Sequence, residues 1–109
     1  MEIRRGDLVT IAFAGDYGKP RPALVVQADA FDALTSVTVL PLTSELHDWP
    51  LFRITVEADR DTGLRSRSQV MVDKAATVAR SRVGRRIGRL DADKVKAVGA
   101  ALAKFVGLD

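Results

Sequence analysis

The chain has 109 residues and a mass of 11.8 kDa, which is the size of one domain with one core, and its net charge is +3. It contains no cysteine, which excludes disulfides and thiolate metal sites. Its apolar runs span at most four residues and no signal peptide follows the start, so we expect a cytoplasmic protein without a membrane span.

Two strands are predicted near the start of the chain. Residues 7–13 alternate between two faces and are rich in β-branched side chains, as strands are. Glycines and prolines then mark a loop at 15–20. Residues 23–27 are almost entirely apolar, which predicts a second strand that is covered on both faces.

A short helical turn is expected next, at 28–34, and it would deliver Phe31 to the core. Residues 36–42 form a third predicted strand, with Pro41 near its end, where a missing amide donor is best tolerated. A polar loop at 45–50 follows.

The second half of the chain continues this pattern. In the fourth predicted strand, 52–57, the apolar side chains share one face and Arg53 lies on the other. A charged loop with Gly63 as its turn residue separates it from the remaining strands. These are a strand bent around Asp73 and Lys74, formed by residues 69–72 and 76–78, and a last strand at 83–90.

One amphipathic helix closes the chain. Asp91 is a good N-cap, and Asp93 complements the helix dipole in the first turn. The apolar stripe of this helix comprises Val95, Val98, Leu102, Phe105 and Val106. Five or six short strands before a single helix predict a mainly β fold, a small curved sheet or partly open barrel, over one domain at 1–109.

Cationic side chains are concentrated in one part of the sequence. Residues 60–89 hold nine cations and two carboxylates, a local charge of +7, and arginines outnumber lysines 12 to 5 in the whole chain. The segment forms either a solvated face or a surface for an anionic partner, since arginine suits phosphate and carboxylate oxygens.

The composition of the chain argues against several common kinds of catalytic site. One histidine and no cysteine leave no plausible zinc site, and no glycine-rich phosphate loop is present. A Ser-His-Asp triad would depend on His47, which we expect to be a surface loop residue. Trp49 beside it either lies partly buried against the sheet or stacks on a base.

Arg21 and Thr43 form the strongest candidate site. If the second and third strands are antiparallel neighbours, Arg21 at the start of one lies beside Thr43 at the end of the other. A guanidinium and a hydroxyl at one sheet edge suit a phosphate. The alternative is structural, with Arg21 paired to Asp16 and Thr43 capping its strand.

The motifs RGDLV, RPALVVQ, LPLTS, a strand ending in VD, and IGRL before a terminal helix occur in this order. In this the chain resembles the MazF/PemK toxins of type II toxin-antitoxin modules, from Arg5 to Leu108. The resemblance implies an SH3-like, plasmid-maintenance-toxin barrel and a homodimer. It also implies sequence-specific, metal-independent cleavage of single-stranded RNA, with mRNA the expected substrate and no cofactor.

Matching positions imply roles for individual residues. RNA supplies its own nucleophile, the 2′-hydroxyl, so the protein needs to orient the strand, assist proton transfer and stabilise charge, and the products are a 2′,3′-cyclic phosphate and a 5′-hydroxyl. Of the implied catalytic residues, Arg21 stabilises the phosphate or takes part in proton transfer, and Thr43 holds a phosphate oxygen. Asp73 matches an aspartate that is interpreted as a general base in some members. The implied RNA-binding residues are Asp16, Lys19, Ser44, Gln69 and Lys74.

The chain departs from the family pattern at three positions. Lys74 replaces the glutamine of an Asp-Gln pair, Met71 replaces an arginine, and Gly15 stands where some members carry serine or histidine. Either Arg21 and Thr43 perform most of the chemistry, or Gln69, Asp73 and Lys74 reshape the site, or the activity is weak or different.

Two other functions remain open. The related CcdB group uses the same fold to poison DNA gyrase through an aromatic-containing C-terminal tail, but Phe105 is assigned here to the buried stripe of the helix. An inactive homologue retained for binding its antitoxin is the other. The toxin interpretation implies a cognate antitoxin with an acidic, disordered tail that folds over the basic groove.

Overall fold

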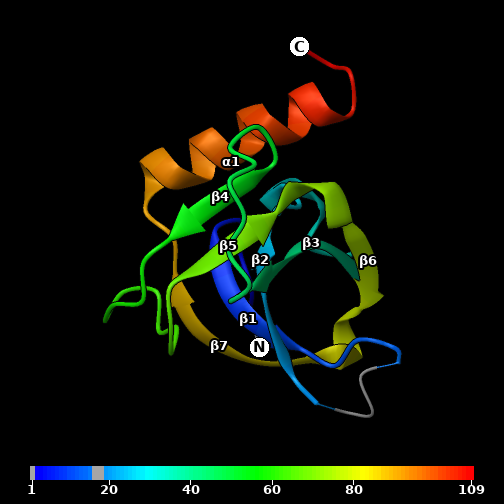
Figure 1. The fold of residues 1–109 in the computed structure, drawn as a ribbon. Helices are drawn as coiled ribbons and strands as arrows, with labels where there is room; N and C mark the ends of the chain where they lie inside the picture. Colours follow the sequence, from blue (N-terminus) through cyan, green and yellow to red (C-terminus); the bar gives the residue numbers. More distant parts are fainter. Residues whose placement is uncertain (1, 16–18) are drawn as a thin grey trace.

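The computed structural model describes residues 2–15 and 19–109, which fold into a strongly curved antiparallel sheet of seven strands and one long helix (Figure 1). The mainly β class with a C-terminal helix is therefore confirmed. No helix among these residues is long and apolar enough to cross a membrane. The elements are β1 (Asp7–Ile11), β2 (Arg21–Val25), η1 (Asp29–Phe31), β3 (Ser36–Thr43), β4 (Arg53–Val56), β5 (Ser68–Met71), η2 (Val72–Lys74), β6 (Ala76–Ala79), η3 (Arg80–Arg82), β7 (Val83–Arg89) and α1 (Ala92–Phe105).

Strand β3 is shared between two parts of the sheet. The strand order is β4-β5-β3-β2-β1-β7, and β6 pairs with β3 outside this path. One edge of β3 pairs with β2, while its other edge pairs with β6 over Ser36–Val39 and with β5 over Leu42 and Thr43. The turn η2 separates β5 from β6, which confirms the predicted bend around Asp73 and Lys74.

Alternating side chains bury both faces of the sheet. On one face Leu8, Leu24 and Leu40 belong to a core cluster that α1 covers with Val98. On the opposite face Val9, Ile11, Ala23, Val25, Val37 and Val39 form a second cluster. The apolar run of the second strand is thus covered on both sides, as predicted. The helix begins as predicted, because the Asp91 Oδ1 accepts a hydrogen bond of 2.8 Å from the Lys94 amide.

Three aromatic and aliphatic side chains lie outside the core, contrary to prediction. Phe31 is 57% exposed, because η1 is a three-residue surface turn without a buried residue. Phe105 and Val106 are each 55% exposed. The helix stripe packs on the sheet only as far as Leu102, so the last turn of α1 extends beyond the core.

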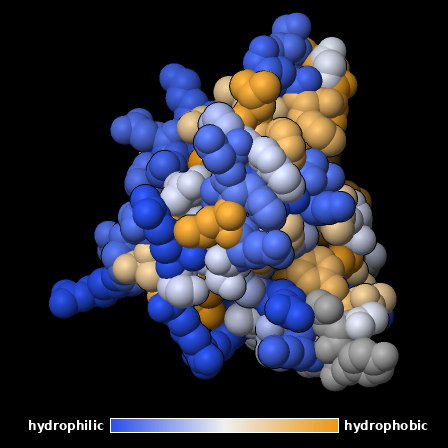
Figure 2. Space-filling view, in the orientation of Figure 1, coloured by the Kyte–Doolittle hydropathy of each residue, from blue (hydrophilic) through white to orange (hydrophobic). Residues whose placement is uncertain are grey.

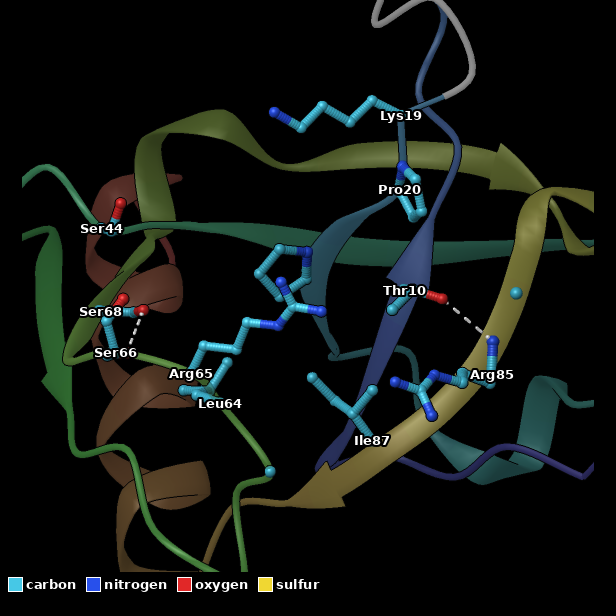
Figure 3. A pocket seen from close by; sticks show the side chains of 13 residues that line it. Thr10, Lys19, Pro20, Ser44, Leu64, Arg65, Ser66, Ser68, Arg85 and Ile87 are labelled. Carbon is cyan, nitrogen blue, oxygen red and sulfur yellow. Dashed lines mark hydrogen bonds between the residues drawn. The ribbon is translucent and has the colours of Figure 1, made fainter.

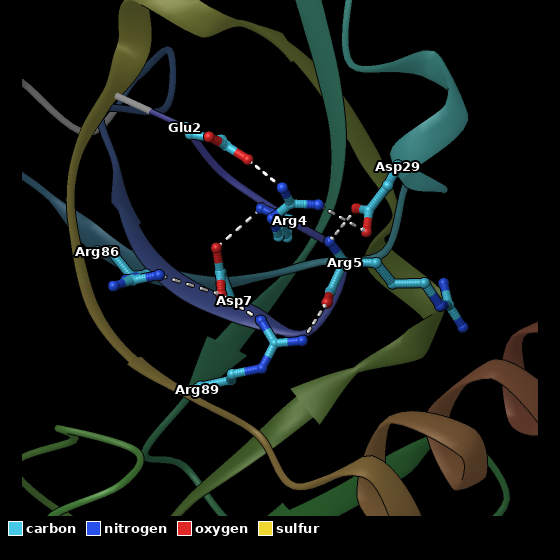
Figure 4. A network of polar contacts seen from close by, with 7 residues as sticks. All are labelled: Glu2, Arg4, Arg5, Asp7, Asp29, Arg86 and Arg89. Atoms are coloured by element: carbon cyan, nitrogen blue, oxygen red, sulfur yellow. Dashed lines mark hydrogen bonds and ion pairs between the residues drawn. The ribbon is translucent and has the colours of Figure 1, made fainter.

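A carboxylate buried under the N-terminal segment links that segment to the last strand (Figure 4). Asp7 is fully buried and accepts hydrogen bonds from the Arg4 amide at 2.8 Å and from Arg89 Nη1 at 2.6 Å. Arg86 lies 3.9 Å away. A buried carboxylate is tolerated only when it is paired in this way, so Asp7 fixes where the chain enters β1 against the end of β7.

The charged loop between β4 and β5 is held tightly against β7. Thr62 is buried, and its hydroxyl donates to the Glu57 carbonyl at 2.9 Å and accepts from the Asp59 amide at 3.1 Å. Gly63 has a φ of 68°, and a Cβ there would lie 1.9 Å from the Ile87 carbonyl oxygen. Only glycine fits this approach.

Gly63→Ala is expected to lower the free energy of unfolding by more than the roughly 1–2 kcal/mol that a left-handed conformation costs by itself, because the new methyl group also collides with β7. Gly107→Ala is the matched control, since Gly107 has a φ of 79° and nothing within 4 Å of an added Cβ. Chemical denaturation measures both variants. Equal decreases in the free energy of unfolding for the two variants would show that the loop moves away from β7 at no extra cost, and would contradict the close packing at Gly63.

Candidate functional site

The candidate site lies where β2 begins and β3 ends. The two strands are antiparallel, with Ala23 opposite Pro41 and Leu24 opposite Leu40. The same register, continued for two residues, brings Arg21 opposite Thr43. The antiparallel pairing on which the predicted juxtaposition depended is therefore present, and Arg21 and Thr43 lie at the same end of the strand pair.

Thr43 is held by its neighbours and keeps a proton to donate. Its hydroxyl accepts a hydrogen bond of 3.0 Å from the Glu45 amide, so the predicted capping role is present. A hydroxyl that accepts one bond still donates another, and this leaves Thr43 able to bind a phosphate oxygen. Arg21 is exposed. Asp16, its predicted alternative partner, lies outside the described residues.

Gln69 supports the loop next to Thr43. It pairs with Thr43 across the strands and is 5% exposed. Its side-chain oxygen accepts from the His47 amide at 3.0 Å, and its nitrogen donates to the His47 carbonyl at 2.8 Å and to the Thr55 hydroxyl at 3.3 Å. The amide thereby fixes the chain at 45–50 beside the site.

The side chain of Asp73 binds an arginine that the sequence did not single out. Arg53 Nε lies 2.8 Å from Asp73 Oδ1, and Arg53 Nη2 lies 3.1 Å from Oδ2, a bidentate pair. The hydrogen bond from Arg53 lowers the pKa of the Asp73 carboxyl below its ordinary value. Arg53 is only 9% exposed. Strand alternation places it on the face opposite Phe52, but does not indicate that this face is buried.

Aromatic rings cover this ion pair and order the loop. The rings of His47 and Trp49 stack with centroids 3.9 Å apart and an interplanar angle of 3°. The Arg53 guanidinium lies 5.1 Å from the Trp49 centroid. Trp49 is 44% exposed, which agrees with the predicted partial burial against the sheet. The exposed part of its ring is still accessible to a base.

A second feature, here called the basic pocket, opens beside the same strand ends and has a volume of about 640 Å³ (Figure 3). Loop, strand and turn residues line it: Thr10, Lys19, Pro20, Pro22, Ser44, Gly63, Leu64, Arg65, Ser66, Ser68, Gly84, Arg85 and Ile87. Successive strand residues point to opposite faces, so Pro22 lines this pocket while Arg21 points to the other face of β2.

The predicted RNA-binding residues thus fall into separate places. Lys19 and Ser44 line the basic pocket, Gln69 lies beneath the 45–50 loop, and Lys74 is exposed in η2. The residues that sequence reasoning missed are Arg53, Arg65 and Arg85. Their only signal was the excess of arginine. Across the described part of the chain, no group of three histidine, aspartate or glutamate side chains is placed to hold a metal ion.

Comparison with known proteins agrees with this architecture. The protein-family model described as PemK-like, MazF-like toxin of type II toxin-antitoxin system matches residues 4–106 of this chain. The chain is 47% identical over 107 residues to a Mycolicibacterium smegmatis protein named probable endoribonuclease MazF, a match that covers 97% of this chain and 98% of that one.

Solved structures show the same similarity. The Mycobacterium tuberculosis toxin MazF-mt6 matches with a TM-score of 0.81 and 28% identity, over 94% of this chain and 98% of that chain. A chain of the MazE-MazF crystal structure (Form-II) from Deinococcus radiodurans matches with a TM-score of 0.82 and 26% identity, over 100% and 99% of the two chains. The protein therefore belongs to the PemK-like, MazF-like toxin family of type II toxin-antitoxin systems.

Proposed function

We propose that this toxin is a sequence-specific, metal-independent endoribonuclease that cleaves single-stranded RNA, with mRNA as its substrate. The observation that carries the proposal is the position of Arg21 and Thr43 at one end of the β2–β3 pair. The name of the Mycolicibacterium smegmatis relative, probable endoribonuclease, supports the same activity.

In the proposed reaction the RNA 2′-oxygen attacks the adjacent phosphorus. The new bond joins O2′ to phosphorus and the bond from phosphorus to O5′ breaks. The proton of the 2′-hydroxyl passes to solvent water, and the leaving O5′ takes up a proton from solvent. The products are a 2′,3′-cyclic phosphate and a 5′-hydroxyl. Arg21 offsets the negative charge that develops on the phosphate oxygens, and Thr43 donates a hydrogen bond to one of them.

Asp73 acts in this scheme through Arg53. A carboxylate whose pKa is held below its ordinary value is a weak proton acceptor near neutral pH, so its arrangement suits positioning better than general-base catalysis. The bidentate bond fixes Arg53 beneath Trp49 and thereby holds β4 against η2. Gln69 has a similar positioning role for the 45–50 loop, and Lys74 stays in the proposal as an RNA contact.

We propose two protein partners. The Deinococcus radiodurans structure contains MazE with MazF, which supports a cognate antitoxin, and an acidic disordered tail would suit the cations of residues 60–89. A second copy of this chain is the other partner. Apolar side chains gather toward the C-terminal end of α1 (Figure 2), where Phe105, Val106 and Leu108 are more than half exposed, and they offer a face for self-association.

The exposure of Phe105 also removes one objection to the gyrase-poison alternative. The sequence interpretation set that function aside because Phe105 was assigned to the buried stripe, yet the ring is 55% exposed. Purified DNA gyrase incubated with the protein and plasmid DNA distinguishes the two functions. Trapped gyrase-DNA complexes together with intact RNA would favour the gyrase poison.

Arg21→Ala and Thr43→Ala are expected to reduce RNA cleavage by about 100-fold or more, since each removes a group that contacts the charge of the transition state. The measurement is digestion of a long single-stranded RNA in EDTA, with mapping of the new 5′ ends. Lys94→Ala on α1 serves as the control and should cleave normally. Full activity in both strand-end variants would contradict the proposed site.

Asp73→Asn is expected to lower the free energy of unfolding by about 2 kcal/mol at neutral pH, because Arg53 loses its charged partner. The folded pKa of Asp73 is lowered, so its stabilisation is present above the unfolded pKa and is lost as the pH falls through the folded value, below the ordinary 3.8. The difference between wild type and variant should therefore close in that acidic range, while the exposed Asp48→Asn should differ little at any pH.

The same variant separates positioning from base catalysis. If Asp73 only positions Arg53, Asp73→Asn slows cleavage by a similar factor at every pH above the acidic range in which Asp73 is protonated, and the shape of the pH–rate profile is kept there. Loss of the acidic limb of that profile would instead identify Asp73 as the general base.

Light scattering at micromolar concentration should give twice the chain mass of 11.8 kDa. Phe105→Ser should shift the protein toward the monomer, because it removes apolar area from the proposed face. Phe31→Ser is the matched control, since Phe31 is similarly exposed at 57% in η1. A monomeric wild type would refute the dimer, and an unchanged mass for Phe105→Ser would place the interface elsewhere.

A further inference from the structure

The basic pocket contains two arginine side chains that the rest of the described chain leaves without a hydrogen-bonding or charged partner. Arg65 comes from the loop between β4 and β5, and Arg85 comes from β7 on another wall. Within residues 2–15 and 19–109, no hydrogen bond or ion pair engages either guanidinium. Arg53 and Arg89 in contrast are bound to carboxylates. In Figure 3 the Arg65 side chain reaches into the middle of the pocket.

The remaining lining matches a flat, acceptor-rich ligand. Pro20, Pro22, Leu64 and Ile87 supply apolar surface, and Lys19 and several hydroxyls supply further donors. Among the residues that the structure describes, no lining residue is a carboxylate. The pocket therefore presents apolar walls to a ring and only positive charges to the ring's edge, which disfavours edges that carry amino donors.

The walls that carry these arginines are rigid. The Thr62 hydroxyl and the close approach of Gly63 to Ile87 fix the loop just before Arg65. The Arg85 amide donates to the Thr10 hydroxyl at 3.1 Å, which fixes β7 against β1 at the pocket. Preformed walls reduce the entropy lost on binding.

We propose that the basic pocket binds a guanine base of the substrate RNA through its O6 and N7 atoms, and that Arg65 and Arg85 determine this specificity. Guanine carries two adjacent acceptors on one edge, which an arginine fork binds with two parallel hydrogen bonds. On the corresponding edge adenine and cytosine each present an amino donor, and uracil lacks the adjacent pair of acceptors. Cytosine also carries adjacent acceptors, N3 and O2, on its pairing edge, so cytosine is the competitor that the test must separate from guanine. The proposal rests on the proposed RNA cleavage, and it names the base that the enzyme recognises next to the cleaved phosphate.

The strand that carries Arg21 connects the pocket to the proposed catalytic site. Pro20 and Pro22 line the pocket, and Arg21 between them points to the other face of β2. A bound RNA would turn around this strand end, with its phosphate near Arg21 and Thr43 and a neighbouring base in the pocket. RNA recognition commonly uses bases splayed out of the stack in this manner.

The test measures binding and does not require cleavage. Short 2′-O-methyl oligouridines, which lack the attacking hydroxyl, carry one central guanine, adenine, cytosine, uracil or 7-deazaguanine, and fluorescence anisotropy gives their affinities. We expect guanine to bind about tenfold more tightly than the other bases, and 7-deazaguanine, without the N7 acceptor, to lose that preference. Arg65→Ala, Arg85→Ala and Arg65→Lys should abolish the preference, because lysine lacks the fork.

Arg60→Ala is the matched control, since Arg60 is an exposed arginine of the same loop that does not line the pocket. It should keep the preference for guanine. Equal affinities for all bases, a preference for another base, or a guanine preference that survives Arg65→Ala would each overturn the proposal. The proposal would also be overturned if the protein bound a glutamate-rich peptide tightly through Arg65 and did not bind the oligonucleotides.

The outcomes separate this inference from the proposed activity. Guanine preference without cleavage of unmodified RNA supports the pocket and refutes the nuclease. Cleavage at words that contain no guanine supports the nuclease and refutes the pocket.

Discussion

The pairing of β3 with three other strands is the constraint on which the rest of the structure depends. β3 has eight residues, of which 39–41 pair with β2 along one edge. Along the other edge residues 36–39 pair with β6, and Leu42 and Thr43 pair with β5. Pro41 lies between the stretches paired with β6 and β5, where its missing amide donor costs the ladder least. Because β3 passes between the two parts of the sheet, its end at Thr43 becomes a junction where β2, β5 and the 45–50 loop meet.

This junction separates two kinds of surface. Arg21 lies on the face of β2 that also holds the buried Ala23 and Val25, at the end of that face. Pro22 lies on the opposite face and lines the basic pocket. The alternation of the strand thereby directs Arg21 to one face and Pro22 to the other. The prolines also keep the chain extended and free of amide donors at the strand entry, so the arginine is presented from a stiff backbone.

The arginine-rich segment combines structural and available charge. Arg80 donates to the Leu34 carbonyl, Arg82 to the Ala12 carbonyl, and Arg89 to buried Asp7, so these three hold loops and termini together. Arg65 and Arg85 have no such contacts among the described residues and face the basic pocket. Of the two sequence interpretations, a solvated face and an anion-binding surface, neither describes the whole segment.

The sequence by itself determined the approximate positions of the strands, the single helix with its Asp91 cap, the mainly β class and the family, because alternation, capping and motif order are local properties of the chain. It predicted five or six strands where the sheet has seven, and it started the second strand two residues after Arg21, where β2 begins. Tertiary structure decided the rest. Phe31 and Phe105 have the hydropathy of core residues, but the sheet ends before it reaches them. Asp73 looks like a free acid in sequence, yet its partner Arg53 lies 20 residues away and is recruited only by the pairing of β4 with β5. Charge partners distant in the chain are set by register, and no local pattern of residues encodes which arginines remain unpaired.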